Sequence, residues 1–542
     1  MSSKPAKPGY TRYCPGEESV KISDAVCMGR RRANFHKCPG CQFNDDERGL
    51  GEPVPGVTTQ RPLVVHVQGQ RTQPALRKER DDMDPIHRVF KAYDVRAIVP
   101  DPLSEDVAWR IGNATAQFLR TSLSGYDRSD DAMNTLIIGR DMRSHSPALA
   151  RAFIEGARAT GGRVVDIGMI DTSQIYFATN HMPCCGGVQT TASHNPSNYN
   201  GFKICGPKGK PIGQDTGLRE IERIAAAISR HRVLDGEPVR VVDLSEPYRA
   251  QLQRFLQPIR PLKVVVDASN GMAGRWFPIL FSGTPNLTVI PLNFEHDGEF
   301  VHPPNPLVEA NLAQLQAAVR EHGADIGACF DGDADRCVFV DENGRTVPSD
   351  LLTALLAEEY LRQRPGATIV YDLRSSRVVA DVVRRAGGIP RRERVGHVFM
   401  KRTMAECDAA FGGELSGHFY FRDFYYCDSG MLAFVAVLNA LTRRNQSLGT
   451  LMSSLCVYAA SGERNFENED KQGTFAKISR QYSDAEIDQL DGVTVQYPDW
   501  WFNVRASNTE PLLRLNMEAA NRELLERRLA ELTPLLGHPV DH

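Results

Sequence analysis

Residues 186–201 read GGVQTTASHNPSNYNG, and the rest of the chain is organised around this stretch. GGVQT is typical of a short buried strand, and the polar turn TTASHNP that follows places Ser193 next to His194. Ser, Asn and Pro favour turns for local reasons, so an ordinary capping turn is one interpretation. A serine at the end of a strand is also well placed to be phosphorylated, and three later segments favour this second interpretation.

Length and composition limit the class of protein. At 542 residues the chain is too long for one core, and about 150 residues per domain predicts three or four domains. The formal net charge of -3 gives no electrostatic argument for binding nucleic acid or an anionic membrane. The sequence contains no apolar run of about 18 residues, so we expect no membrane span. The N-terminus lacks the apolar core of a signal peptide. We therefore expect a cytoplasmic protein with reduced thiols.

Residues 1–84 differ in character from the rest of the chain. They are polar and rich in Pro and Arg, and they contain Cys14, Cys27, Cys38 and Cys41. The pair in CPGC can present two thiolates to Zn²⁺, and the two earlier cysteines can complete a tetrahedral shell. The alternatives are a small zinc knuckle and a tail in which the cysteines are incidental. The end of this segment reads as a linker.

From Ile86 onward, strands alternate with amphipathic helices, which predicts an α/β fold with mainly parallel sheets. This alternation of strands and helices begins again twice, and near residues 493–516 the pattern becomes typical of an antiparallel sheet. We expect three similar mixed α/β domains and a smaller C-terminal α+β domain, with bounds 85–241, 242–346, 347–457 and 458–542.

Individual elements follow from local signals. Ser104 is a predicted N-cap, with two acidic residues in the first turn of the helix. Asp-Glu-Asn-Gly at 341–344 predicts a hairpin turn, and residues 89–99 are expected to form a strand that enters a charged loop. The other expected helices are 149–159, 216–231, 351–362, 378–386 and 522–536.

DGDADR, which follows the apolar run ADIGACF, is the strongest chemical signal in the chain. Asp331, Asp333 and Asp335 repel one another on a short loop, and a hard divalent cation with oxygen ligands relieves that repulsion. An EF-hand would need Glu342 as its last ligand, but a strand intervenes. The pattern favours a Mg²⁺ site, where a phosphoserine at 193 would become a better electrophile.

Two further loops carry clustered polar side chains. In GGELSGH, Glu414 and Ser416 lie two residues apart on an extended segment and can grip neighbouring sugar hydroxyls. In RASNTEP, Arg505 and the hydroxyl groups that follow can form a cradle for a phosphate dianion. Each loop by itself is also compatible with a tight polar turn.

TTASHNP, DGDADR, GGELSGH and RASNTEP occur in this order, one in each predicted domain. With FKAYDVR, GRDMRSHSP, YNGFK, VVVDASNGMAG, HPPNPL and YDLRSSR, they make the chain from Ile86 resemble the α-D-phosphohexomutase superfamily, within it the bacterial phosphomannomutase/phosphoglucomutase group. The resemblance implies four domains around a central cleft and a phosphorylated Ser193 bound to Mg²⁺ with the three aspartates. A hexose 1- or 6-phosphate would be converted through a hexose 1,6-bisphosphate, which also serves as activator.

The resemblance also assigns roles to individual side chains. It places Arg96, His194, Lys203 and Arg336 around the reacting phosphoryl group, with Lys203 or His194 as the proton-transfer group. The positions that would contact the substrate are Arg374, His397, Glu414, Ser416, His418, Arg505, Ser507, Asn508 and Thr509. Arg96-Ala97 replaces the Arg-Gly that is frequent in the family, and we expect little effect because the charge is kept.

Several alternatives stay open at this point. A phosphoglucosamine mutase is the nearest, although Tyr199-Asn200-Gly201-Phe202 and Asn508 favour mannose and glucose phosphates. A non-catalytic scaffold that uses the N-terminal cysteine segment is a second, and a Mg²⁺-dependent phosphatase is a third. The preference between mannose and glucose phosphate, and between monomer and homodimer, is left undecided.

Overall fold

The computed structural model describes residues 84–122, 130–231, 237–507 and 512–540, and the backbone of two short strands before them. The chain forms two compact units, Met1–Pro74 and Ala75–His542. In the first, β1 (Arg12–Cys14) pairs antiparallel with β2 (Glu17–Ile22). Cys14 ends β1, whereas Cys27, Cys38 and Cys41 lie outside the described residues, so the zinc knuckle stays a prediction.

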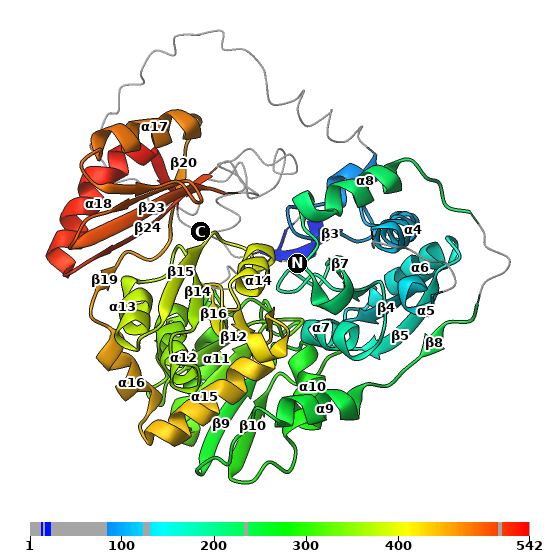
Figure 1. The fold of residues 1–542 in the computed structure, drawn as a ribbon, viewed down its shortest axis with the longest axis horizontal. Helices are drawn as coiled ribbons and strands as arrows, with labels where there is room; N and C mark the ends of the chain where they lie inside the picture. The colour runs from blue at the N-terminus through cyan, green and yellow to red at the C-terminus, as the bar shows by residue number, and fades with distance from the viewer. Residues whose placement is uncertain are drawn as a thin grey trace, which may run out of the picture. The chain divides into compact units, whose positions relative to one another are not determined.

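The second unit contains four sheets, and each sheet with its helices is called domain I to IV in chain order (Figure 1). Domain I has the sheet order β3-β7-β6-β4-β5-β8, in which β5, β4 and β6 are parallel and β7 is antiparallel to β6. The strands are β3 (Val95–Ile98), β4 (Thr135–Arg140), β5 (Arg163–Met169), β6 (Gly186–Thr190), β7 (Tyr199–Cys205) and β8 (Arg240–Val241). The helices are α3 (Pro85–Val89), α4 (Glu105–Thr121), α5 (Asp131–Asn134), α6 (Ser146–Arg158), α7 (Thr172–His181) and α8 (Leu218–Ala226).

Domain II has the sheet order β10-β9-β11-β12-β13. Its strands are β9 (Leu262–Asp267), β10 (Leu287–Leu292), β11 (Ile326–Phe330), β12 (Cys337–Val340) and β13 (Thr346–Val347). The helices are α9 (Ser245–Gln253), α10 (Met272–Phe281) and α11 (Ala313–His322). β12 and β13 form the hairpin predicted from the turn residues.

Domain III repeats this topology with the order β15-β14-β16-β17-β18. Its strands are β14 (Thr368–Asp372), β15 (Ile389–Glu393), β16 (Phe411–Gly413), β17 (Phe419–Phe421) and β18 (Cys427–Asp428). The helices are α12 (Ser349–Gln363), α13 (Arg377–Arg385), α14 (His397–Glu406), α15 (Gly430–Arg444) and α16 (Leu448–Leu455). In domains II and III the first strand in chain order pairs parallel with the second and the third, and the fourth turns back antiparallel to the third.

The shared topology explains where the polar loops lie. β4, β5, β6 and β7 of domain I repeat the same arrangement of four strands. TTASHNP follows β6, DGDADR follows β11 and GGELSGH follows β16, so each loop leaves the carboxyl end of the third strand before an antiparallel fourth strand. Ligands of open α/β sheets bind beyond these strand ends. The fold therefore presents equivalent loops from three domains.

Domain IV is an antiparallel sheet in the order β21-β22-β23-β24-β20-β25, with β19 also paired to β24. Its strands are β19 (Ala459–Ala460), β20 (Arg464–Glu467), β21 (Glu486–Asp488), β22 (Val493–Gln496), β23 (Trp500–Ala506), β24 (Leu512–Ala519) and β25 (His538–Val540). α17 (Lys471–Gln481) and α18 (Arg522–Leu536), orange and red in Figure 1, pack against this sheet around a common core. The predicted α+β character and the predicted last helix are confirmed.

Two local predictions are wrong. Residues 89–99 do not form one strand, because Val89 ends helix α3 and the chain turns at 91–94, where the backbone N–H of Lys91 donates to the carbonyl oxygen of Asp94. β3 therefore begins only at Val95. The helix expected at 216–231 is restricted to α8, since Gly217 has a φ of 149°, which an α-helix does not contain. The N-cap role of Ser104 is confirmed by its hydrogen bond from the backbone N–H of Val107.

Among the described residues, no helix has the length and apolar character needed to cross a membrane.

Helices α4 and α6 approach closely at two glycines. A Cβ atom on Gly112 would lie 2.1 Å from the carbonyl oxygen of Phe153, and one on Gly156 would lie 2.0 Å from that of Trp109. Trp109 and Phe153 are themselves buried beside this contact. The absence of two side chains thus lets the helix backbones touch and holds domain I together.

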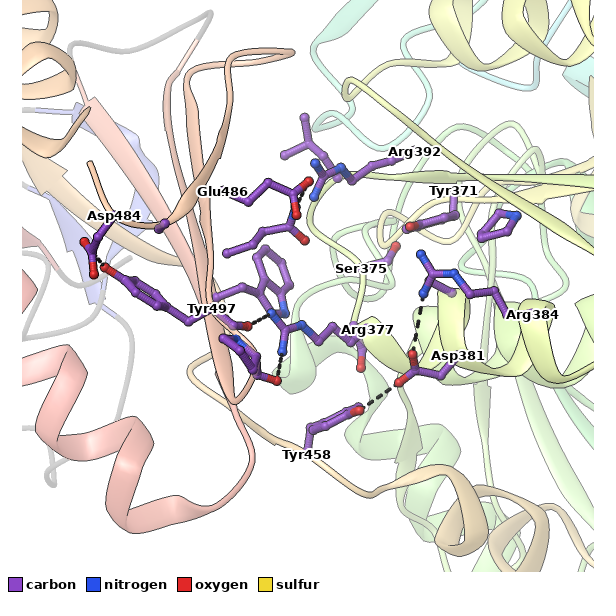
Figure 2. A pocket seen from close by; sticks show the side chains of 18 residues that line it. Tyr371, Ser375, Arg377, Asp381, Arg384, Arg392, Tyr458, Asp484, Glu486 and Tyr497 are labelled. Carbon is purple, nitrogen blue, oxygen red and sulfur yellow. Dashed lines mark hydrogen bonds and ion pairs between the residues drawn. The ribbon is translucent and has the colours of Figure 1, made fainter. Parts of the chain in front are cut away.

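Domain IV is joined to domain III around Glu518 of β24, which is 4% exposed. Its carboxylate accepts hydrogen bonds from Ser376 Oγ, from the backbone N–H of Arg377 at 2.9 Å and from Trp501 Nε1 at 2.7 Å. Figure 2 shows the Arg377 side chain directed at the β22–β23 turn, where it donates to backbone carbonyl oxygens, among them that of Pro498. A cavity of about 730 Å³ lies beside this junction, away from Ser193.

The α4–α6 contact leads to the first prediction. We expect Gly112→Ala to lower the stability of the protein by about 1–3 kcal/mol, because the added methyl group has no space between the helices. The midpoint of urea unfolding measures this loss. Glu105→Ala, on the exposed first turn of α4, is the control and should change stability by less than about 0.5 kcal/mol. Equal midpoints for both variants would contradict the close packing.

A second prediction concerns the junction of domains III and IV. Glu518→Gln should cost about 1.5–3 kcal/mol, because it replaces a charged acceptor of three hydrogen bonds by an amide. We expect limited proteolysis to release domain IV faster from this variant than from the wild type. Glu523→Gln, at an exposed position of α18, is the matched control. Unchanged cleavage of the Glu518 variant would show that Glu518 does not secure the junction.

Candidate active site

The loop after β6 (residues 190–199, the serine loop) holds Ser193 in a left-handed conformation with a φ of 51°. Ser193 is 1% exposed, and its Oγ donates a hydrogen bond to Asp331 Oδ2 at 2.8 Å and lies 3.2 Å from His194 Nδ1. A Cβ atom on residue Gly332 would lie 2.4 Å from the carbonyl oxygen of Ser193. Glycine at this position therefore lets the serine loop meet the loop after β11.

The loop after β11 (residues 331–336, the aspartate loop) contains three buried carboxylates. Asp331, Asp333 and Asp335 each place one oxygen within 4.8 Å of the other two. Burial, together with the charges of its two neighbours, raises the pKa of Asp331 to about 8. Asp333 Oδ1 accepts no hydrogen bond within the part of the chain that the structure describes. The same holds for Asp335 Oδ1. A cluster of repelling oxygens, two of them without a hydrogen bond from the described residues, fits a hard divalent cation such as Mg²⁺.

One oxygen of Asp333 is fixed from domain I. Thr172 at the start of α7 donates its hydroxyl to Asp333 Oδ2 at 2.6 Å, and its backbone N–H donates to the carbonyl oxygen of Asp333. Lys203 Nζ donates to the same Oδ2 at 2.7 Å and also to Asp335. These bonds hold the carboxylate so that Oδ1 stays available to a ligand.

Positive charge surrounds the junction of the two loops. Burial alone would lower the pKa of Lys203, but Asp333 and Asp335 raise it well above its usual value. Arg96 donates to Asn195 Oδ1 at 2.8 Å, and Arg336 places its Nε 3.8 Å from Asp331 Oδ2. The site thus holds cationic groups from domains I and II beside Ser193.

His194 completes this group of side chains. Burial and the nearby charge of Arg336 lower the pKa of His194 well below its usual value. Its ring is therefore neutral near neutral pH, at hydrogen-bonding distance from Ser193.

The loop after β16 (residues 414–418, the glutamate loop) joins the aspartate loop through His418. Its Nε2 lies 3.5 Å from Asp335 Oδ1 and accepts a hydrogen bond from Arg336 Nε at 3.3 Å. Its Nδ1 lies 3.0 Å from Ser416 Oγ and 3.3 Å from Glu414 Oε2. This imidazole ring connects domains II and III at the site, together with a backbone hydrogen bond from the N–H of Cys337 to the carbonyl oxygen of Gly417.

Glu414 is buried and remains ionised. Burial would raise its pKa, but hydrogen bonds with His418 and Tyr420 lower it to about 2. The Tyr420 hydroxyl donates to Oε2, and the backbone N–H of Gly396 donates to Oε1 at 3.0 Å. Oε1 accepts one of these bonds and keeps a lone pair, so the carboxylate can still accept from a ligand hydroxyl.

Arg374 and His397 come from the same domain. Arg374 follows β14 and forms a bidentate pair with Asp372, with Nη2 2.8 Å from Oδ2. His397 begins α14, with its ring centroid 6.4 Å from that of His418. Lys203 and His397 also line one small cavity, which brings domains I and III together.

Domain IV contributes Arg505 and Ser507 near the end of β23. Arg505 Nη2 donates to Glu463 at 2.8 Å, and burial together with the charge of Arg374 lowers the pKa of Arg505. The Arg374 guanidinium thus lies close enough to disfavour the charge of Arg505, which an anion between the two groups would relieve. Ser507 is 8% exposed. The predicted Asn508 and Thr509 lie in 508–511, outside the described residues.

The structure brings the predicted side chains of domains I, II and III into one continuous set of contacts. Thr172, Tyr420 and Arg143 belong to this set but were not among the predicted site residues. Arg143 lies within the quoted motif GRDMRSHSP, which was a usable signal. Thr172 and Tyr420 carry no sequence signal, since a threonine at a helix start and a tyrosine in a strand are ordinary.

Comparison with known proteins agrees with these observations. Residues 87–232 match the model of phosphoglucomutase/phosphomannomutase alpha/beta/alpha domain I, 246–344 match domain II, 348–458 match domain III and 464–535 match the C-terminal domain. The predicted fold and the predicted resemblance are confirmed by these matches.

The alignments with individual relatives extend over almost the whole length of each relative. The phosphohexose mutase of Xanthomonas campestris is 40% identical over 457 residues, which are 82% of this chain and 98% of the relative. An Escherichia coli phosphomannomutase is 39% identical over 465 residues, with the same coverage. A crystal structure of a phosphoglucomutase/phosphomannomutase family protein from Burkholderia thailandensis has a TM-score of 0.74 and 32% identity, covering 83% of this chain and 96% of that one. The chain belongs to the phosphoglucomutase/phosphomannomutase family.

Proposed function

We propose that this protein is a phosphohexose mutase that moves a phosphoryl group between the 1- and 6-positions of mannose or glucose phosphate through Ser193. The hydrogen bond from Ser193 Oγ to Asp331 carries the proposal, because it puts a nucleophile at a cluster of carboxylates and cations from two domains. Family membership supports the same reaction. Phosphoryl transfer of this kind depends on positioning and electrostatics more than on covalent chemistry.

The transfer has two balanced halves. Phosphorylated Ser193 gives its phosphoryl group to a free hydroxyl of the hexose phosphate: a P–O bond to the sugar forms, the bond to Oγ breaks, and the sugar's proton ends on Oγ. The hexose 1,6-bisphosphate then turns over and returns its other phosphoryl group to Ser193. His194 and Lys203 are the candidate proton-transfer groups, and His194 lies nearer to Oγ. A trace of the bisphosphate would phosphorylate resting enzyme and act as activator.

Asp331, Asp333, Asp335 and the phosphorylated Ser193 would hold Mg²⁺. When bound, this ion withdraws charge from the phosphoryl group and makes phosphorus more electrophilic. Arg96, Lys203 and Arg336 are the chain's own cations at the same place, and they favour the charge that develops on the phosphoryl oxygens.

The sugar would be held from domains III and IV. Glu414 and Ser416, with His418 beside them, are proposed to bind two ring hydroxyls, with Arg374 and His397 as further contacts. Arg505 and Ser507, with Asn508 and Thr509, are proposed to bind the phosphate that is not transferred. Since the bisphosphate must bind in two orientations, the contacts with the ring have to serve both.

The substrate assignment rests on relatives named phosphomannomutase and phosphohexose mutase. Glucosamine phosphate is the alternative substrate. A non-catalytic scaffold is disfavoured, since the predicted polar residues of the three loops are all present and Ser193, the three aspartates and His418 contact one another. The cytoplasmic location, the monomeric or dimeric state and the zinc site of residues 1–84 stay predictions.

A coupled assay on mannose 1-phosphate and glucose 1-phosphate, with Mg²⁺ and a trace of glucose 1,6-bisphosphate, tests the proposed reaction. Ser193→Ala should lower turnover by more than about 10³-fold, because no other group can take the phosphoryl group. Ser197→Ala removes a hydroxyl from the same loop and should leave turnover unchanged. Turnover that survives in the Ser193 variant would contradict the phosphoserine. No wild-type turnover on either sugar would lead to glucosamine 6-phosphate as the next substrate.

The metal site is tested by thermal unfolding with added Mg²⁺. At about 100 times its dissociation constant, a bound ion should stabilise the wild type by about 2.7 kcal/mol. Asp333→Asn should abolish most of this gain because it removes a charged ligand of the same size. Glu321→Gln, an exposed acid of α11, should keep the gain and controls for net charge. An equal Mg²⁺ shift in both variants would exclude the three aspartates as the metal site.

A further inference from the structure

Arg143 is a fully buried cation next to the serine loop. Its side chain is 0% exposed. Its guanidinium donates to four backbone carbonyl oxygens of that loop: Nη2 to those of Ser193 at 2.8 Å and Asn195 at 2.7 Å, and Nη1 to those of Pro196 at 2.6 Å and Tyr199 at 3.1 Å. One side chain from the β4–α6 loop thus spans the whole turn that carries Ser193.

The guanidinium is held in place from its other sides. Its Nε lies 3.2 Å from Asp141 Oδ2, which gives an ion pair without the alignment of a hydrogen bond. Asp141 Oδ1 accepts the backbone N–H of Arg143 and the hydroxyl of Ser146. The ring of Phe300, from domain II, lies 5.1 Å from the guanidinium carbon. Asp141 and Phe300 therefore leave the side chain little freedom to turn.

Stability alone is a poor explanation for this arrangement. Burying an ion pair costs desolvation that the attraction between the charges often fails to recover. The effect of the four hydrogen bonds is local, because they direct four carbonyl oxygens of the serine loop toward the Arg143 guanidinium. Oxygens directed there do not face the carboxylates at Asp331 or the oxygens of a phosphoryl group on Ser193. The same bonds hold Ser193 in its left-handed conformation, which costs about 1–3 kcal/mol in an ordinary residue.

Domain III offers an internal comparison. Arg374 follows the first strand of its sheet as Arg143 follows β4, and in both places the arginine's backbone N–H donates to an aspartate two residues earlier. The Arg374 guanidinium donates to Asp372 and, among the described residues, to no backbone carbonyl. Equivalent positions of the repeated fold thus make different contacts: the Arg374 guanidinium pairs with an aspartate of its own domain, and the Arg143 guanidinium holds the serine loop.

We propose that Arg143 is a positioning residue for phosphoryl transfer, which fixes the serine loop so that Ser193 Oγ points at the aspartate loop. This inference rests on the proposed function of Ser193. Arg143 itself does not touch the reacting atoms, and its effect should appear in the rate of transfer and not in the affinity for the sugar phosphate.

The test uses full-length protein and the Arg143→Lys variant, which keeps the charge but can no longer reach four acceptors. The uptake of a phosphoryl group from glucose 1,6-bisphosphate is followed by intact mass, beside kcat and KM in the mutase assay. We expect uptake and kcat to fall by about 100-fold, as for a misplaced reacting group, with KM little changed.

Arg120→Lys is the matched control. Arg120 is also buried in domain I and also donates to a backbone carbonyl oxygen, that of Thr160, but it lies in α4 away from the serine loop. It should lower the unfolding midpoint and leave the rate of uptake unchanged. Phe300→Leu is a second variant, which loosens the guanidinium without removing it, and it should slow uptake by a smaller factor.

Two results would overturn the inference. One is an uptake rate in Arg143→Lys no lower than in Arg120→Lys. The other applies if Arg143→Lys does not fold: an unchanged rate in Phe300→Leu would then exclude the positioning role. A wild type that takes up no phosphoryl group would refute the proposed function and the role of Arg143 together, whereas normal uptake by both wild type and Arg143→Lys would refute the role of Arg143 alone.

Discussion

The concentration of buried negative charge at Asp331, Asp333 and Asp335 is the constraint on which the site depends. Three carboxylates within 4.8 Å of one another, all removed from water, are stable only next to compensating positive charge. Lys203 supplies part of that charge from domain I, and the oxygen of Asp333 without a partner leaves room for a cation. Ser193 lies against the same cluster, so the need to balance charge and the need to hold a phosphoryl group are met at one place.

The repeated topology explains how parts distant in sequence reach this place. In domains I, II and III the functional loop follows the third strand of the same arrangement, and an antiparallel fourth strand closes it. Polar groups then join neighbouring domains: the hydroxyls of Ser193 and Thr172 join I to II, and His418 joins II to III. Glu518 secures domain IV to domain III beside Arg377. The hydrophobic cores of domains I, II and III are continuous with one another, as Ile175, Phe330 and Phe434 belong to one cluster, whereas domain IV has a core of its own.

Sequence was sufficient for the order of the domains, for the four loops and for most of the side chains that meet in the candidate site, whose roles stay predictions. These features depend on local patterns: strand, polar turn, and residue types whose chemistry is specific, such as three alternating aspartates. The sequence was insufficient where the contacts of a side chain depend on residues far away along the chain. Thr172 is ordinary until α7 meets the aspartate loop, and the direction of the Arg143 side chain depends on the serine loop that it holds. The strand expected at 89–99 is wrong because the chain turns at 91–94 between helix α3 and strand β3.

We propose that a metal ion bound by the aspartate loop also binds the phosphoryl group of phosphorylated Ser193. Mn²⁺ in place of Mg²⁺ allows electron-nuclear double resonance to detect a phosphorus nucleus bound through oxygen to the metal. The account predicts a strong phosphorus coupling in enzyme phosphorylated by glucose 1,6-bisphosphate, and no such coupling after phosphoryl removal or in the Ser193→Ala variant. A phosphorylated, active enzyme whose bound Mn²⁺ shows no coupling to phosphorus would contradict it.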